Sequence, residues 1–177
     1  MANTYTLISS VTVGAGGAAS IDFTSIPATY TDLKLVLSLR GNAAQYDDYI
    51  NLRFNNDSGA NYSARNLSAV GGGGVDSRSW SAQTYGYAFQ IDAANSTANT
   101  FGNVEIYIPN YTSSNTKSFS NDGVAEQNGD TWTNRQSSLN AGLWSGTAAI
   151  NRITLSVGGS TLWVQYSTAY LYGIKNS

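Results

Sequence analysis

Residues 32–42 of this 177-residue chain read DLKLVLSLRGN and carry its clearest structural pattern. A leucine occupies every second position of its first part, at Leu33, Leu35, Leu37 and Leu39. A period of two sends successive side chains to opposite faces of a β-sheet. Burying each leucine is worth roughly 1.5 to 3 kcal/mol, so a second layer must cover the leucine face. We therefore predict that this stretch is an inner strand of a sandwich.

The same alternation recurs along most of the chain, and no segment repeats apolar residues at helical spacing for three turns. We expect further strands at residues 5–13, 21–23, 50–54, 62–70, 85–91, 101–108, 150–157 and 161–174. Turn-forming residues separate these segments. The sequence predicts an all-β protein, a single antiparallel two-sheet sandwich domain of jelly-roll type over residues 1–177.

Other segments have less regular patterns. We expect residues 1–4 to form a short N-terminal arm, and residues 71–79, which begin with four glycines, to form a flexible loop. Residues 111–121 suit an edge strand or a loop. Residues 62–70 are the expected hairpin partner of the strand at residues 50–54. Between residues 122 and 140 the apolar anchors are Val124, Trp132 and Leu139.

The composition argues against an enzyme and predicts neither cofactor nor metal. The chain has no histidine and no cysteine, which removes the usual general base, the thiolate nucleophile and the commonest metal ligands. Asp47 and Asp48 are adjacent in sequence, whereas a glycosidase needs two carboxylates that face each other across a bond. Residues 55–59 faintly resemble a calcium loop but lack the acid that would supply the bidentate ligand.

Charge and hydropathy argue against nucleic acid and membrane as partners. Only 11% of the residues are charged and the net charge is −2, so the concentration of Lys and Arg that phosphate binding needs is missing. No stretch approaches the ~20 apolar residues of a membrane helix. The N-terminus lacks the pattern of a secretory signal, so we expect the protein to be made in a cytoplasm.

Aromatic residues are the more informative feature, at 12% of the chain with 12 Tyr and 4 Trp. Two tryptophans lie in polar surroundings, where an amphipathic ring either anchors a partner, stacks on a sugar or caps the end of the core. Trp144 and Trp163 have apolar neighbours and are expected in the core. The candidate residues for contact with a partner or a glycan are Trp80, Trp132, Tyr85 and Tyr87.

Four segments of the chain resemble a recurring type of small virion protein of tailed bacteriophages. They are YTLISSVTV (5–13), IPATYTDLKLVLSLRGN (26–42), INLRFNNDSGANYS (50–63) and YSTAYLYGIK (166–175). The middle, about residues 69–145, matches least. Proteins of this type are jelly-roll-like modules on the phage surface, which either decorate or cement the capsid shell or form part of a tail fibre.

The resemblance implies a capsid cement or decoration protein that binds the major capsid protein of the assembled head. It further implies a homotrimer on the virion surface, made in the cytoplasm of a host bacterium. The alternative is a tail-fibre or lectin-like module that contacts tail proteins and binds host-surface glycan. A cement protein stabilises the shell by mass action, and a weakly charged surface of Ser, Thr and Asn with aromatic anchors suits that role.

Overall fold

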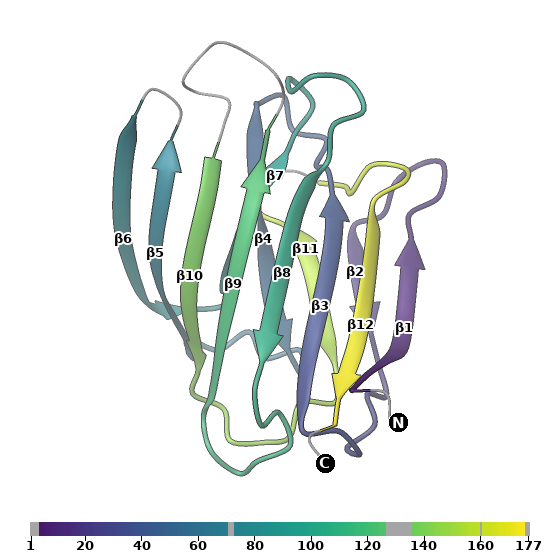
Figure 1. Ribbon diagram of the computed structural model, residues 1–177, viewed down its shortest axis with the longest axis vertical. Helices are drawn as coiled ribbons and strands as arrows, with labels where there is room; N and C mark the ends of the chain where they lie inside the picture. The colour runs from purple at the N-terminus through teal and green to yellow at the C-terminus, as the bar shows by residue number, and fades with distance from the viewer. Residues whose placement is uncertain (1–3, 71–72, 127–135, 160, 176–177) are drawn as a thin grey trace.

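The computed structural model of the chain describes residues 4–70, 73–126, 136–159 and 161–175. These residues form twelve β-strands in two antiparallel sheets and contain no helix, which confirms the predicted all-β sandwich (Figure 1). The larger sheet has the spatial order β1 (Tyr5–Thr12), β12 (Thr168–Ile174), β3 (Asp32–Leu39), β8 (Gly102–Ile108), β9 (Lys117–Ala125), β10 (Gln136–Trp144), β5 (Tyr62–Val70) and β6 (Gly74–Gln83). The smaller sheet has the order β2 (Ser20–Phe23), β11 (Ile153–Val157), β4 (Asp47–Phe54) and β7 (Gly86–Asp92).

The strand order is that of a jelly roll with two inserted hairpins. The chain passes from one sheet to the other at every connection except those between β5 and β6, β8 and β9, and β9 and β10, and the strands β1-β12-β3-β8 face β2-β11-β4-β7. The hairpins β5–β6 and β9–β10 are inserted into this frame and pair beyond β8. The larger sheet therefore extends past the edge of the smaller one on the side of β6 (Figure 1).

The leucine face of β3 lies at the centre of the core, as the sequence predicts. Its four leucines are at most 1% exposed, and β3 pairs with β12 on one side and β8 on the other. Trp144 and Trp163 are also buried, which confirms both as core residues. The indole of Trp163 donates a hydrogen bond to the carbonyl oxygen of Leu155 at 3.2 Å.

Three expectations for the middle of the chain are wrong. Residues 74–79 were expected in a loop but begin strand β6, which pairs along its length with β5. Strand β5 does not pair with β4, because the two strands belong to different sheets. Strand β9, expected at an edge or in a loop, lies inside the larger sheet between β8 and β10. Of the expected N-terminal arm, residues 1–3 lie outside the described residues.

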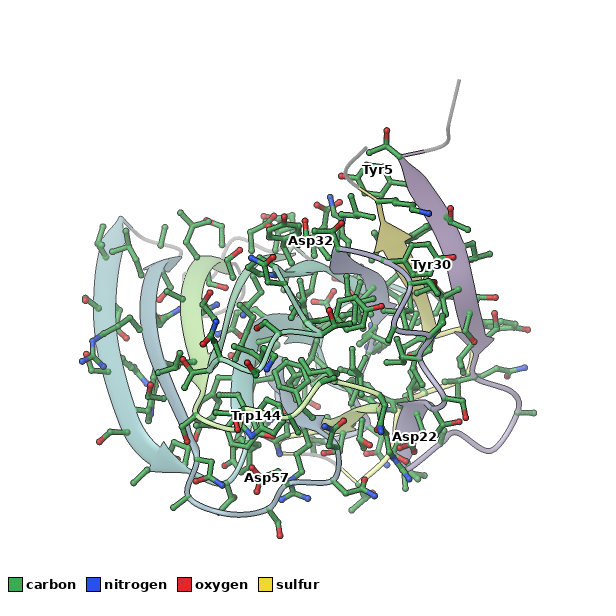
Figure 2. All side chains as sticks on the ribbon, turned by 90° about the horizontal axis from the view of Figure 1, so that it is seen from below. Tyr5, Asp22, Tyr30, Asp32, Asp57 and Trp144 are labelled. Atoms are coloured by element: carbon green, nitrogen blue, oxygen red, sulfur yellow. The ribbon has the colours of Figure 1, made fainter. Side chains whose placement is uncertain are left out.

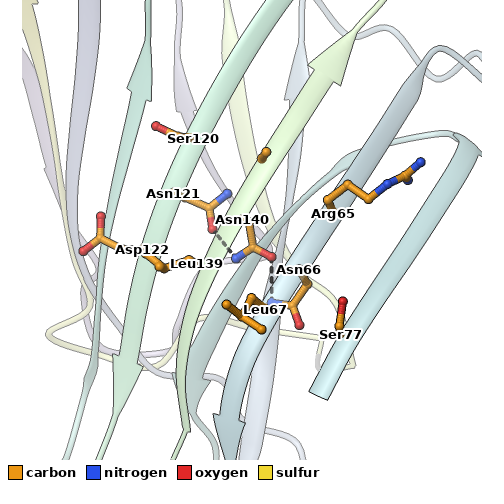
Figure 3. A pocket seen from close by; sticks show the side chains of 10 residues that line it. Arg65, Asn66, Leu67, Ser77, Ser120, Asn121, Asp122, Leu139 and Asn140 are labelled. Atoms are coloured by element: carbon orange, nitrogen blue, oxygen red, sulfur yellow. Dashed lines mark hydrogen bonds between the residues drawn. The ribbon is translucent and has the colours of Figure 1, made fainter. Parts of the chain in front are cut away.

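A chain of asparagines holds the extension of the larger sheet in register. Asn66 Nδ2 donates to Asn140 Oδ1 at 2.8 Å, and Asn140 Nδ2 donates to Asn121 Oδ1 at 2.7 Å (Figure 3). Asn121 Nδ2 then donates to the carbonyl oxygen of Tyr87 in the smaller sheet, at 3.1 Å. All three side chains are buried. Because their amides are paired with one another, the inner face of β9, β10 and β5 can be polar without leaving these groups unsatisfied.

Candidate interaction surfaces

The outer face of the larger sheet is one continuous surface across eight strands (Figure 1). The strand register defines a central row of side chains on this face, from β1 to β6: Ser10, Tyr170, Val36, Glu105, Asp122, Leu139, Leu67 and Ser77. None of these side chains is buried. The row shows that the outer face mixes apolar and charged side chains and is wide enough to contact a broad partner.

Exposed apolar side chains are concentrated on this larger sheet. Among the described residues, every large apolar side chain that is exposed belongs to one of its strands, with the exceptions of Tyr46 and Tyr166. The group is Tyr5, Leu7, Leu67, Val75, Tyr107, Val124, Leu139, Leu143 and Tyr170. Leu139 is 62% exposed and Leu67 is 51% exposed. Exposed apolar patches of this kind mark interaction sites in soluble proteins.

Leu67 and Leu139 face each other across β5 and β10 and form the centre of what we call the leucine patch, together with Val75, Val124 and Ala69. Two hollows adjoin this patch, of about 560 and 380 Å³, and both are lined by Leu67 and Leu139. Figure 3 shows the hollow of about 560 Å³. Val124 and Leu139, expected as apolar anchors of the core, therefore point outward instead. The patch offers shape as well as apolar surface to a partner.

The charges on this outer face are few and partly paired. Lys34 Nζ lies 2.6 Å from Glu105 Oε2. The hydroxyl of Tyr107 donates to Asp32 Oδ2 at 2.7 Å, and this hydrogen bond, with burial, raises the pKa of Tyr107 to about 12. Tyr107 is therefore neutral at physiological pH. The surface gives a partner little net charge to desolvate.

A second feature is an aromatic cluster at the edge of the smaller sheet. The ring of Tyr87 lies 5.0 Å from the rings of both Trp80 and Tyr85 and 5.6 Å from that of Tyr49, measured between centroids. Trp80 belongs to β6, Tyr87 to β7 and Tyr49 to β4, so the cluster joins the edges of the two sheets. The Tyr49 ring lies against Gly158, where an added Cβ would be 2.1 Å from the ring. All four rings are partly exposed.

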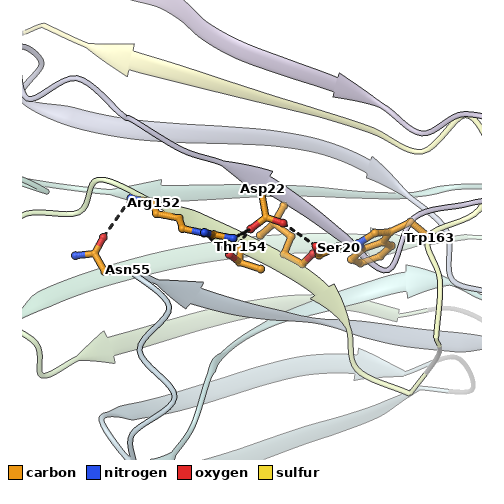
Figure 4. Close-up of polar contacts among 7 residues, drawn as sticks. Ser20, Asp22, Asn55, Arg152, Thr154 and Trp163 are labelled. Carbon is orange, nitrogen blue, oxygen red and sulfur yellow. Dashed lines mark hydrogen bonds and ion pairs between the residues drawn. The ribbon is translucent and has the colours of Figure 1, made fainter.

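Hydroxyl and amide side chains cover the outer face of the smaller sheet next to this cluster. The register places Ser20, Ser156, Asn51 and Tyr87 in one row. Asn51 Oδ1 is buried and has no hydrogen-bond partner. In the neighbouring row, Arg152 Nη2 lies 2.6 Å from Asp22 Oδ1 (Figure 4). The two outer faces of the sandwich thus differ in chemistry, since this one is polar and the other is partly apolar.

The structure brings three of the four predicted contact residues together. Trp80, Tyr85 and Tyr87 lie in the aromatic cluster, and Trp132 lies outside the described residues. Sequence reasoning missed Tyr49 and Asn51 because only the pairing of β4 with β7 brings them to the cluster.

Two of the carboxylates considered at the sequence level, Asp48 and Asp57, have structural partners. Asp48 Oδ1 accepts hydrogen bonds from the backbone N–H groups of Tyr49 at 2.8 Å and Gly159 at 2.7 Å. Asp57 Oδ2 accepts from the indole of Trp144 at 2.6 Å, which ties the turn after β4 to the core (Figure 2). Within the described ranges, no three acidic side chains gather in a group that could hold a metal ion. No helix in those ranges is long and apolar enough to cross a membrane.

Comparison with known proteins gives no relative for this chain: no protein-family model matches it, and no curated protein or solved structure is detectably similar.

Proposed function

We propose that this chain is a non-catalytic structural protein of a tailed-bacteriophage virion, a capsid cement or decoration protein that docks on the assembled head. The observation that supports the proposal is the gathering of exposed apolar side chains on the larger sheet, with the leucine patch at one end. The partner in this proposal is the major capsid protein, because four sequence segments resemble those of phage virion proteins. A homotrimer is part of this proposal.

The leucine patch can supply binding energy without any catalytic group. Burying a leucine that is half exposed or more contributes about 1 to 2 kcal/mol, and a few such side chains surrounded by polar residues suffice for a specific interface. A protein that binds only the assembled shell opposes its disassembly by mass action. The proposed result of docking is therefore a shell that resists heat.

The test is binding of the purified chain to head shells that lack it. We expect Leu139→Asp to weaken binding by roughly tenfold or more, because it places a charge in the apolar contact. Tyr166→Asp is the matched control, since Tyr166 is 69% exposed and lies outside the larger sheet. Equal binding by the two variants would contradict the proposed docking face.

The copy number in purified virions separates a head protein from a tail protein. A cement protein is present in hundreds of copies, and shells without it lose heat resistance. A copy number close to that of tail-fibre proteins would overturn the head assignment and favour the tail alternative.

A further inference from the structure

We infer that the outer face of the smaller sheet, together with Trp80 of β6 at its edge, carries a binding site for a neutral oligosaccharide, centred on Trp80, Tyr85 and Tyr87. The inference goes beyond the docking role and does not depend on it, because the leucine patch and the proposed site share no residue. It rests on three features: the aromatic cluster, the row of polar side chains beside it, and the pairing of the charged side chains around them.

The aromatic cluster has the form that a pyranose ring requires. A pyranose has an apolar face of C–H bonds and a rim of hydroxyl groups, so it binds on an aromatic ring that has polar groups beside it. The Trp80 and Tyr85 rings both pack on Tyr87, at 5.0 Å, and all three remain partly exposed. Tyr87 is further supported by Tyr49 at 5.6 Å. Since each ring is held by another, the platform is ordered before a ligand arrives, which lowers the entropic cost of binding.

The row next to the platform supplies hydrogen-bonding groups. Asn51 is the cross-strand neighbour of Tyr87, and its Oδ1 atom has no hydrogen-bond partner. An unmet buried acceptor costs free energy, and a sugar hydroxyl inserted beside Tyr87 would satisfy it. Ser156 continues the row on β11. The hydroxyl oxygen of Tyr87 lies 3.3 Å from both Gln83 Oε1 and the Tyr85 hydroxyl oxygen, and these are long hydrogen bonds that a ligand could replace.

The charges around the platform favour a neutral sugar over an anionic one. Burial and the hydrogen bond with Tyr85 raise the pKa of Tyr87, so its hydroxyl stays protonated. Cationic side chains on or next to the strands around the platform are engaged: Arg53 Nε donates to the carbonyl oxygen of Thr84 at 3.2 Å, Arg152 pairs with Asp22, and Arg78 pairs with Asp76. An acidic sugar bound on this face would lie near the carboxylate of Asp22, and the guanidinium groups of Arg53 and Arg152 already have partners.

The experiment is a titration of the full chain with chitotetraose, cellotetraose and maltotetraose, followed by saturation-transfer NMR and calorimetry. We expect at least one of these neutral probes to bind, with saturation transferred to the C–H face of its sugar rings. Trp80→Ala and Tyr85→Ala should each weaken binding by about tenfold or more, in line with the loss on removing a stacked ring. Trp80→Phe should restore most of the affinity, since it keeps an aromatic face.

Tyr166→Ala is the matched control, because it removes an exposed ring that belongs to none of the strands of the platform and should leave binding unchanged. Circular dichroism and the unfolding midpoint of each variant show whether it is folded; if Trp80→Ala is unfolded, Tyr85→Ala and Trp80→Phe provide the test. Binding of none of the three probes, or unchanged binding by folded Tyr85→Ala, would overturn the inference. Selective binding of an anionic probe such as colominic acid would overturn its assignment to neutral sugars. Neither result would bear on docking through the leucine patch.

Discussion

The ring of Phe119 lies directly on Gly142, its cross-strand neighbour in the larger sheet. A Cβ atom at position 142 would lie 2.1 Å from the ring Cζ, which is closer than any packed structure allows. Phe119 also packs edge-on against Phe54 of the smaller sheet, with centroids 5.6 Å apart. The glycine therefore makes room for a ring that joins the two layers.

Replacing this glycine should destabilise the fold. We expect Gly142→Ala to lower the free energy of unfolding by about 1 to 3 kcal/mol, the usual cost of overpacking a core, as measured by urea denaturation. Gly14→Ala is the control, because a Cβ at Gly14 would meet no atom within 4 Å. If Gly142→Ala lowers the free energy of unfolding no more than Gly14→Ala does, the Phe119 ring can move aside without cost.

The asparagine chain should be a strong contributor to stability. Asn140→Ala leaves Asn66 Nδ2 and Asn121 Oδ1 without their partners, and each unpaired buried group costs about 1 to 3 kcal/mol. Asn103→Ala changes an exposed asparagine on the outer face and should cost little. The comparison is made by chemical denaturation of both variants. If both variants lower the free energy of unfolding equally, the amides of Asn66 and Asn121 must form hydrogen bonds with water or with other groups in Asn140→Ala.

Arg40 should not tolerate lysine. Its guanidinium donates to the carbonyl oxygens of Thr97 and Thr100 at 2.8 Å and of Ser96 at 3.0 Å. A lysine ammonium cannot match this planar set of bonds, and hydrogen bonds to charged groups are worth about 1.5 to 3 kcal/mol each. We expect Arg40→Lys to lower the unfolding midpoint and to speed hydrogen exchange in residues 93–100.

Arg78→Lys is the matched control for Arg40→Lys. Arg78 is exposed and forms an ion pair with Asp76, and exposed ion pairs contribute at most about 1 kcal/mol. If Arg40→Lys is as stable as Arg78→Lys, the conformation of residues 93–100 does not depend on the guanidinium of Arg40.

Asp57 should report the packing of Trp144 through its pKa. Burial raises the pKa of this carboxyl, but hydrogen bonds from Trp144, Asn61 and the Gly59 backbone outweigh that effect and hold it below the ordinary 3.8. Because the pKa is lower in the folded state, Asp57 stabilises the fold above pH 3.8, and this contribution is lost as the pH falls through the folded-state pKa.

The direct measurement is carboxyl NMR titration of the folded protein. Trp144→Phe keeps a ring but removes the indole N–H group, so the pKa of Asp57 should rise. A pKa at or above 3.8 in the unsubstituted protein would contradict the hydrogen bonds that the structure assigns to Asp57.

Much of the fold was predictable because β3 and its neighbours are apolar on their inner face. β10 shows why the extension was not predictable: before the buried Trp144 at its end, its buried positions are Ser138, Asn140 and Gly142, and its leucines point outward. Alternation of apolar and polar residues along a strand does not show which face of the sheet is covered by a second layer. β6 has no apolar alternation at all, since its outward serines at 77 and 79 flank Arg78, and only pairing with β5 makes it a strand.

The candidate sites were predictable to different degrees. Trp80, Tyr85 and Tyr87 could be selected because large rings in polar segments are unusual. Asn51 joins them only through the register of β4 with β7, which sequence does not reveal. The leucine patch was missed because an exposed Leu139 and a buried leucine have the same local pattern.

Electron microscopy of intact virions, at a resolution that shows strands, tests directly whether this chain docks on the head. We expect density for this chain on the head, with the leucine patch against the major capsid protein and the smaller sheet facing outward. Density on the tail, or on the head with Leu67 and Leu139 facing solvent, would contradict it.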